Sequence, residues 1–242
     1  MTIEYSSNAF NAVDSTLNPS ISNFTSSGTN PVLIVVCGAE TATNLTAVNW
    51  NTTESFTQLG STVTNGLNSI SIWYLAGPTA TTANITTSST DPISGVLAVL
   101  LYTGVDQTTP FRTAANSSNT GTDTSPTTDV VALNTEMVVA GVWQKVAGGP
   151  TFTATHTERL QETSLGAGPD GTLAVQEKAS SGATETMSWS STSGNPWMVM
   201  SGAMQAAAGA AASTPGEDLG GSGVGSSGLD TGDNLGGQYL GS

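Results

Sequence analysis

The sequence predicts an all-β protein: an antiparallel β-sandwich, jelly-roll-like, with an extended N-terminal arm and a Gly/Ser-rich C-terminal tail. Three observations predict it. Apolar residues form short runs or alternate with polar residues, which is the pattern of β-strands. The dominant residues, Thr, Ser, Val and Gly, are weak helix formers. Gly, Pro, Asn and Ser turns separate the segments at the spacing of about 8–12 residues that is typical of sandwiches and barrels.

Composition divides the 242 residues into three zones. Residues 1–30 are polar with scattered apolar side chains, and they predict an N-terminal arm or an edge strand. Residues 31–205 carry nearly all the large apolar side chains, and they predict the β-sandwich domain. Residues 206–242 begin with an alanine-rich run and continue as a Gly/Ser stretch. Such a composition cannot form a core, so we expect an extended C-terminal tail.

Apolar runs with large side chains on both faces predict the central strands. Residues 32–37 are apolar throughout and lie between Pro31 and Gly38, as expected of a strand that is buried on both faces. Residues 93–102 and 137–143 have the same character. We expect ten to twelve strands in all. The other predicted strands are residues 45–50, 69–75, 83–88, 152–155, 171–176, 184–190 and 197–204.

The strands are expected to form one domain, because neither half of the chain alone shows a full set of strong core strands. The alternative is two small sandwiches that are divided in the polar loop of residues 113–128.

The charge balance excludes several classes of partner. The chain has 4 Lys and Arg against 18 Asp and Glu, a net charge of -14. Four cations are too few for nucleic-acid binding by phosphate neutralisation, and the acidity disfavours contact with anionic membranes. It would complement a basic surface on a protein partner. No apolar run approaches the roughly 18 residues of a transmembrane helix.

No catalytic residues are predicted. His156 is the single histidine, and the sequence contains no Gly-x-Ser-x-Gly motif of the kind that positions a serine nucleophile. We expect the carboxylates Glu158, Glu162, Glu177 and Glu185 to be solvated residues of strands or loops. A hydrolase stays an alternative that requires two carboxylates, or His156 with a Ser and an Asp, to converge in one cleft.

No metal site and no cofactor are predicted. Zinc prefers four His, Cys or carboxylate ligands, and the chain has only His156 and Cys37 of the first two kinds. We expect Cys37, which lies in an apolar run, to be a small buried side chain. Asp230, Asp233 and Asn234 could supply oxygen ligands, but solvated linker residues are the preferred interpretation.

Five tryptophans could form a sugar-binding platform or fill the core. Most of them lie within or at the end of predicted strands, where a large aromatic side chain usually belongs to the core. Trp197, which follows Asn195 and Pro196, is the one most easily placed at a surface. The five are Trp50, Trp73, Trp143, Trp189 and Trp197.

One stretch carries a resemblance. Trp73-Tyr74-Leu75 is followed by Pro78, and a long apolar strand then ends in GVDQTTP, residues 104–110. This pattern resembles a β-sandwich module that recurs in bacterial and phage-associated proteins. Residues 187–204 look like the closing strand pair of the same module. The resemblance covers residues 31–205 and implies a fold but no catalytic residues.

The arm and the tail look like those of capsid decoration (cement) proteins of tailed phages, an analogy at the level of the fold. It implies a non-enzymatic virion structural protein on the capsid surface, made in the host cytoplasm without a signal peptide. Its partners would be the major capsid protein and other copies of itself in a homo-oligomer, with no nucleic acid and no membrane. The residues expected to bind a partner are Leu219, Val224, Leu229, Leu235, Tyr239 and Leu240.

The alternative function is a carbohydrate-binding or adhesive module of a phage fibre or of a bacterial surface protein. Its partner would be a glycan, bound by an exposed aromatic ring with Asn, Asp or Gln side chains beside it.

Overall fold

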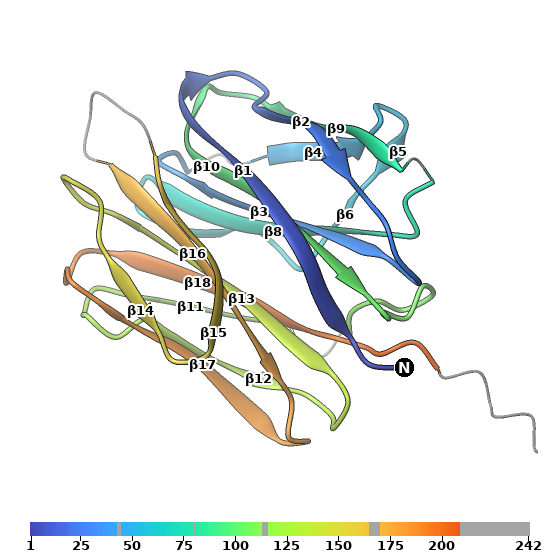
Figure 1. Ribbon diagram of the computed structural model, residues 1–242. Helices are drawn as coiled ribbons and strands as arrows, with labels where there is room; N and C mark the ends of the chain where they lie inside the picture. The colour runs from blue at the N-terminus through green and yellow to red at the C-terminus, as the bar shows by residue number, and fades with distance from the viewer. Residues whose placement is uncertain (43–44, 80, 113–115, 165–169, 209–242) are drawn as a thin grey trace, which may run out of the picture. The chain divides into compact units, whose positions relative to one another are not determined.

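The computed structural model describes residues 1–42, 45–79, 81–112, 116–164 and 170–208. The regular secondary structure of these residues consists of β-strands, and the paired strands are antiparallel (Figure 1). The prediction of an all-β, antiparallel fold is therefore confirmed. Within the described ranges there is no helix that could cross a membrane.

Strands β1 to β10 form a first sandwich of two sheets. We call the sheet that packs on the second half of the chain the first inner sheet, and the other the first outer sheet. The first inner sheet has the order β1 (Glu4–Thr16), β10 (Ile93–Thr103), β3 (Val32–Ala39), β8 (Asn68–Ala76) and β6 (Thr57–Gln58), with β7 (Val63–Asn65) also paired to β8. The first outer sheet has the order β2 (Ser20–Thr25), β9 (Thr82–Ser89), β4 (Leu45–Trp50) and β5 (Glu54–Ser55).

Strands β11 to β18 form a second sandwich, whose two sheets are named in the same way. The second inner sheet has the order β11 (Ser117–Gly121), β18 (Trp197–Met204), β13 (Met137–Lys145), β16 (Gly171–Ala179) and β15 (Thr157–Thr163). The second outer sheet has the order β12 (Thr127–Val131), β17 (Thr184–Ser191) and β14 (Phe152–Ala154).

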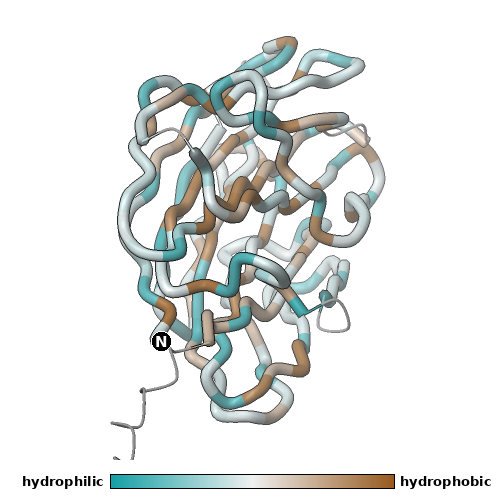
Figure 2. Tube along the Cα trace, turned by 90° about the vertical axis from the view of Figure 1, so that its right-hand side faces the viewer, coloured by the Kyte–Doolittle hydropathy of each residue, from teal (hydrophilic) through white to brown (hydrophobic). Residues whose placement is uncertain are grey.

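Three apolar cores separate the four sheets, so the layers follow one another as outer, inner, inner, outer. The middle core lies between the two inner sheets and joins the sandwiches; Figure 2 shows apolar segments through the interior of this stack. The layering explains why β3 is apolar throughout. Leu33 and Val35 face the first outer sheet, whereas Ile34 and Val36 face the second sandwich.

The two sandwiches have the same topology. The inner orders β1-β10-β3-β8-β6 and β11-β18-β13-β16-β15 correspond strand by strand, and so do the outer orders β2-β9-β4 and β12-β17-β14. In each sandwich the chain alternates between the sheets so that its first strand lies beside its last. This is the interleaving of a jelly roll, which is built from two Greek keys. The chain therefore contains an internal structural repeat, in which each sandwich is one copy.

A short sequence correspondence accompanies the repeat. Ser88-Ser89-Thr90 ends β9 and precedes Pro92 and β10, and Ser190-Ser191-Thr192 ends β17 and precedes Pro196 and β18. The first buried positions of β9 and β17 also match in spacing. Little else is shared, because a repeated fold requires only the burial pattern to be kept.

The repeats pack on each other with approximate two-fold correspondence. Strand β8 contacts β13 and β18, and the equivalent strand β16 contacts β3 and β10. The seams match as well, because β1 contacts β15 and β11 contacts β7. This reciprocity is the property of an isologous interface between two copies, here within one chain.

Two glycines mark the crossing of the inner sheets. Gly38 of β3 lies opposite Val96 on β10, and Gly141 of β13 lies opposite Met200 on β18. A Cβ atom on Gly38 would lie 2.3 Å from Cε3 of Trp143. Glycine is therefore required for the close approach of the sheets.

The predicted strands are confirmed, since each of the ten predicted segments corresponds to an observed strand. The expected number was too low, because the described residues contain eighteen strands. The loop predicted at residues 113–128 contains β11 and the first residues of β12. Their polar sequences pair at sheet edges, where one face remains exposed to solvent.

The N-terminal segment is an edge strand and not a free arm. Strand β1 pairs with β10 from Glu4 to Thr16, and β2 pairs with β9. The sequence favours one domain, with two small sandwiches as the alternative. The described residues form one compact unit, but its strands divide into two sandwiches at the connection between β10 and β11.

The GVDQTTP motif of residues 104–110 forms the turn that follows β10. The Asp106 carboxylate accepts hydrogen bonds from the backbone N–H groups of Thr108 and Thr109, both at 2.8 Å, and these bonds lower the pKa of Asp106. Val105 is fully buried and forms a β-bridge with Ala206. The motif thus fixes the end of the described chain against the first sandwich.

Candidate functional site

Every Lys and Arg of the chain lies in an ion pair. The chain has 4 such residues, and each is within ion-pair distance of one glutamate. The chain has 18 Asp and Glu residues against these four cations, which gives the net charge of -14. The pairs are Arg112 with Glu136, Lys145 with Glu40, Arg159 with Glu177, and Lys178 with Glu185.

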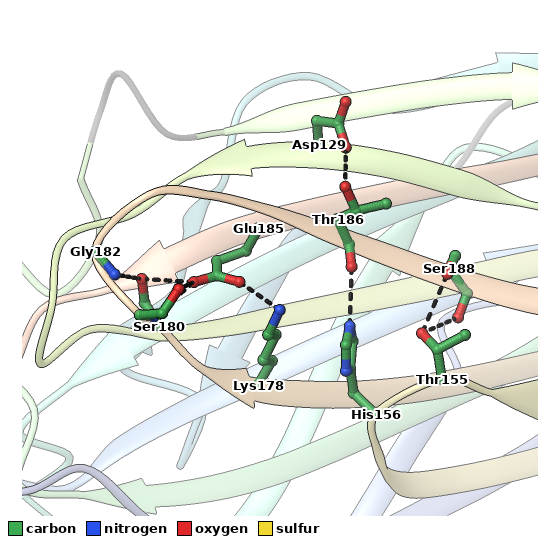
Figure 3. A network of polar contacts seen from close by, with 10 residues as sticks. Asp129, Thr155, His156, Lys178, Ser180, Gly182, Glu185, Thr186 and Ser188 are labelled. Carbon is green, nitrogen blue, oxygen red and sulfur yellow. Dashed lines mark hydrogen bonds and ion pairs between the residues drawn. The ribbon is translucent and has the colours of Figure 1, made fainter.

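Among the described residues, the most enclosed carboxylate is Glu185 on β17, which is 2% exposed. Its Oε2 lies 2.5 Å from Nζ of Lys178, and its Oε1 accepts hydrogen bonds from Ser180 and Ser181 (Figure 3). The Lys178 ammonium and the Ser181 N–H lower the pKa of Glu185 to about 2. Glu185 is therefore a structural anion, and the expectation that it is solvated was wrong.

Glu177 is also buried, at 5% exposure, so its expected solvation was wrong as well. It belongs to a polar cluster where β1 meets β15. The Arg159 guanidinium pairs with Glu177 and lies 4.1 Å from the centroid of the Tyr5 ring. Tyr5 packs edge-on against Tyr102, whose pKa is raised by burial and by the nearby Glu177. This cluster fills one seam between the sandwiches.

His156 is not placed for base catalysis of the serine-hydrolase kind. Its Nε2 lies 2.9 Å from the backbone oxygen of Thr186 (Figure 3). A carbonyl oxygen only accepts hydrogen bonds, so Nε2 carries the proton and donates it. The nearby carboxylate of Asp129 accepts from the Thr186 hydroxyl at 2.6 Å. In these contacts the His156 ring bonds to a backbone oxygen, and the Asp129 carboxylate bonds to the Thr186 hydroxyl. They are not the contacts of a serine-hydrolase triad, in which the ring bonds to both a hydroxyl and a carboxylate.

The other predicted positions are less informative for chemistry. Cys37 is fully buried, as predicted, and burial raises its pKa to about 12. Glu158 and Glu162 lie on β15, and neither belongs to the four ion pairs of the described residues. Within the described part of the chain, no group of three or more His, Cys, Asp or Glu side chains is placed to hold a metal ion.

The tryptophans form no sugar platform. All five are at most 6% exposed. Trp197, the one most easily imagined at a surface, is 2% exposed, and its Nε1 donates to Asp123 at 3.2 Å. It fills the core between the sheets of the second sandwich, so the surface interpretation of Trp197 was wrong.

The predicted partner-binding residues lie outside the described residues. They are Leu219, Val224, Leu229, Leu235, Tyr239 and Leu240, and the tail residues Asp230, Asp233 and Asn234 lie there too.

Two adjoining hollows open on the second seam, where β6 and β7 meet β11 and β18. The first, of about 390 Å³, is lined by residues 60–63 and 116–118 together with Met200. The second, of about 440 Å³, is lined by residues 58–60, Tyr74, Phe111 and Asn116. They share Gly60 and Asn116. We call the two hollows together the seam groove.

The seam groove carries polar groups but no charge among its described lining residues. The Asn116 Oδ1 atom is buried without a hydrogen-bond partner in the described structure. The rings of Tyr74 and Phe111 lie 5.0 Å apart at one end. Sequence reasoning missed this groove because its residues come from five separate parts of the chain, residues 58–63, Tyr74, Phe111, residues 116–118 and Met200.

Comparisons of the chain with protein-family models, with curated proteins and with solved structures find no match.

Proposed function

We propose that the chain is a non-enzymatic virion structural protein, a decoration or cement protein that stabilises a phage capsid. In this role the double sandwich is a rigid head on the capsid surface. It binds the major capsid protein and neighbouring copies of itself.

The observation that carries the proposal is the use of the ionisable side chains. All four cations are held by carboxylates, and the buried anions Glu177 and Glu185 are held by cations. In these ion pairs the charged side chains stabilise the fold. The chain as a whole has a net charge of -14 and is rich in Ser and Thr. A net negative charge steers association with a basic protein surface.

The step to a capsid depends on the fold. Jelly rolls recur in viral capsid proteins and also in lectins, and the GVDQTTP pattern resembles a phage-associated module. A fold alone does not define a function, so the proposal requires a direct test on particles.

The test removes the C-terminal tail. The deletion has to begin after Ala208, because Ala207 donates its backbone N–H to the Gly104 oxygen at 2.8 Å and Ala206 pairs with Val105. The full chain and the chain without residues 209–242 are added to particles that lack the protein, and the bound copies are counted. Equal thermal midpoints for the two proteins show that the head is intact.

We expect the full chain to saturate the particles and the shortened chain to bind at least about tenfold more weakly, since linked contacts strengthen one another. Equal occupancy by the two chains would contradict the role of the tail. Failure of the full chain to bind would contradict the proposed function itself.

A further inference from the structure

We propose that the seam groove is a binding site for a neutral polyhydroxyl ligand, a sugar of one or two rings. The proposal concerns the head alone and does not depend on attachment to a capsid.

The internal repeat shows that the groove occupies a position that is filled in the other seam. At the first seam, Asn8 of β1 donates to the Arg159 oxygen of β15 at 2.6 Å, and the Arg159 side chain covers Tyr5. At the second seam, Asn65 of β7 donates to the Gly121 oxygen of β11 at 3.4 Å. Here the asparagine lies on the strand equivalent to β15, and the seam groove opens between the strands.

The opening results from an interruption of the edge strand. In the second sandwich β15 continues past its bulge between Glu158 and Leu160. In the first sandwich the equivalent edge is divided into β6 and β7, and the residues between them leave the sheet. Gly60 there has a φ of +66°, a conformation that favours glycine. The Gln58 amide donates to the Thr62 hydroxyl at 3.0 Å and holds this connection in place.

The chemistry of the lining selects the ligand class. Ser61, Thr62, Ser118 and Asn116 are among the residues that line the groove, and their hydroxyl and amide groups both donate and accept hydrogen bonds. An anion would find no lysine or arginine in the described lining, and a cation no carboxylate. Neutral hydroxyl groups match such a lining.

Two features indicate a ligand with both a polar edge and an apolar face. Asn116 lines both hollows, and its Oδ1 is buried without a hydrogen-bond partner in the described structure; an unsatisfied buried acceptor calls for a partner. Tyr74 is half-buried beside Phe111, so an aromatic ring is available at the end of the groove for the C–H face of a sugar. Each hollow is also within the range of about 300–1,000 Å³ that is typical of small-molecule sites.

The test uses the purified full chain and a panel of neutral sugars: glucose, galactose, mannose, N-acetylglucosamine and their β-linked disaccharides. Saturation-transfer NMR detects binding, and amide chemical-shift changes locate it. The variants are Asn116→Ala, which removes the amide, and Ser61→Trp, which fills the groove from an exposed loop position. The matched controls are Thr120→Ala and Thr64→Trp, which change exposed residues of β11 and β7 outside the lining.

We expect at least one sugar to bind saturably and to shift the amides of residues 60–63 and 116–118. Asn116→Ala should weaken binding about tenfold, the effect of one lost hydrogen bond, and Ser61→Trp should abolish it, whereas both controls bind like the unchanged protein. The proposal is overturned if no sugar of the panel binds, if the shifts lie elsewhere, or if Ser61→Trp binds normally.

Discussion

Glu185 is a carboxylate that the fold requires in its charged form. It lies within the second sandwich, where Lys178 and the Ser181 N–H stabilise its negative charge. The bound cation and N–H groups hold its pKa at about 2, below the ordinary value of 4.5. A group whose pKa is lowered by folding contributes stability above its unfolded pKa, and this contribution is lost as the pH falls toward the folded value.

We predict that Glu185→Gln lowers the free energy of unfolding by about 1–3 kcal/mol at pH 7, since hydrogen bonds to a charged group are lost and Lys178 loses its partner. The difference from the unchanged protein should stay constant above pH 4.5 and shrink toward pH 2. Urea unfolding at several pH values measures both.

The matched control is Glu4→Gln, which removes the same charge from an exposed position. It should change stability by less than about 0.5 kcal/mol. A Glu185→Gln protein as stable as the Glu4→Gln protein at pH 7 would refute the structural role of Glu185.

Residue type alone did not reveal which carboxylates are buried. Glu185 and Glu162 have similar polar neighbours in the sequence, yet only Glu185 is fully enclosed. Alternation along β17 places Glu185, Met187 and Trp189 on the buried face. The cation that makes this burial tolerable is on another strand, so the pairing could not be predicted from the local sequence.

At the scale of elements, Trp143 on β13 is a point of close contact between the two inner sheets. Its indole packs on glycines of two strands, Gly38 on β3 and Gly171 on β16. A Cβ atom would lie 2.3 Å from the ring at Gly38 and 2.1 Å from it at Gly171. Distances below 3 Å to a buried ring cannot be relieved without moving a sheet, because interiors are close-packed.

We predict that Gly38→Ala destabilises the protein by about 1–3 kcal/mol through overpacking. Combining it with Trp143→Leu should cost at least about 0.5 kcal/mol less than the sum of the single changes, because the smaller side chain leaves room for the methyl group. Chemical denaturation of the four proteins gives this coupling.

Gly194→Ala is the control, since its Cβ would lie 3.4 Å from the nearest atom, the Thr122 oxygen. It should be close to neutral. Additive costs for Gly38→Ala and Trp143→Leu would show that the sheets are not in contact at this point.

The strands differ in how well their sequences predict them. Strands β3, β10 and β13 lie between two cores, and their continuous apolar runs are unmistakable. Strands β11 and β15 lie at sheet edges, where polar side chains are tolerated on the solvent side and the apolar signal is weak. The seam groove lies where the edge strands β6 and β7 of the first sandwich meet the edge strand β11 of the second. Its residues therefore come from different sandwiches, and no single segment of the sequence identifies the groove.

For the whole molecule, the shared middle core determines whether two sandwiches behave as one body. Each inner sheet contributes to two cores. Unfolding of one sandwich would therefore expose the inner face of the other, and the loss of this buried apolar area is unfavourable.

We predict a single cooperative unfolding transition for the head in urea, with coincident changes in tryptophan fluorescence and far-ultraviolet circular dichroism. The tryptophans report on both sandwiches, because Trp50 lies in the first and Trp189 in the second. Two separated transitions would mean that the sandwiches are independent domains.

The central claim, that this chain is a structural component of a virion, is tested most directly by counting it in particles. Phage particles from the source of the sequence are purified by density gradient, and quantitative mass spectrometry gives the ratio of this chain to the major capsid protein. The account predicts a fixed, near-stoichiometric ratio and protection of the chain from removal by washing at low ionic strength. Its absence from purified particles that contain the major capsid protein would contradict the account.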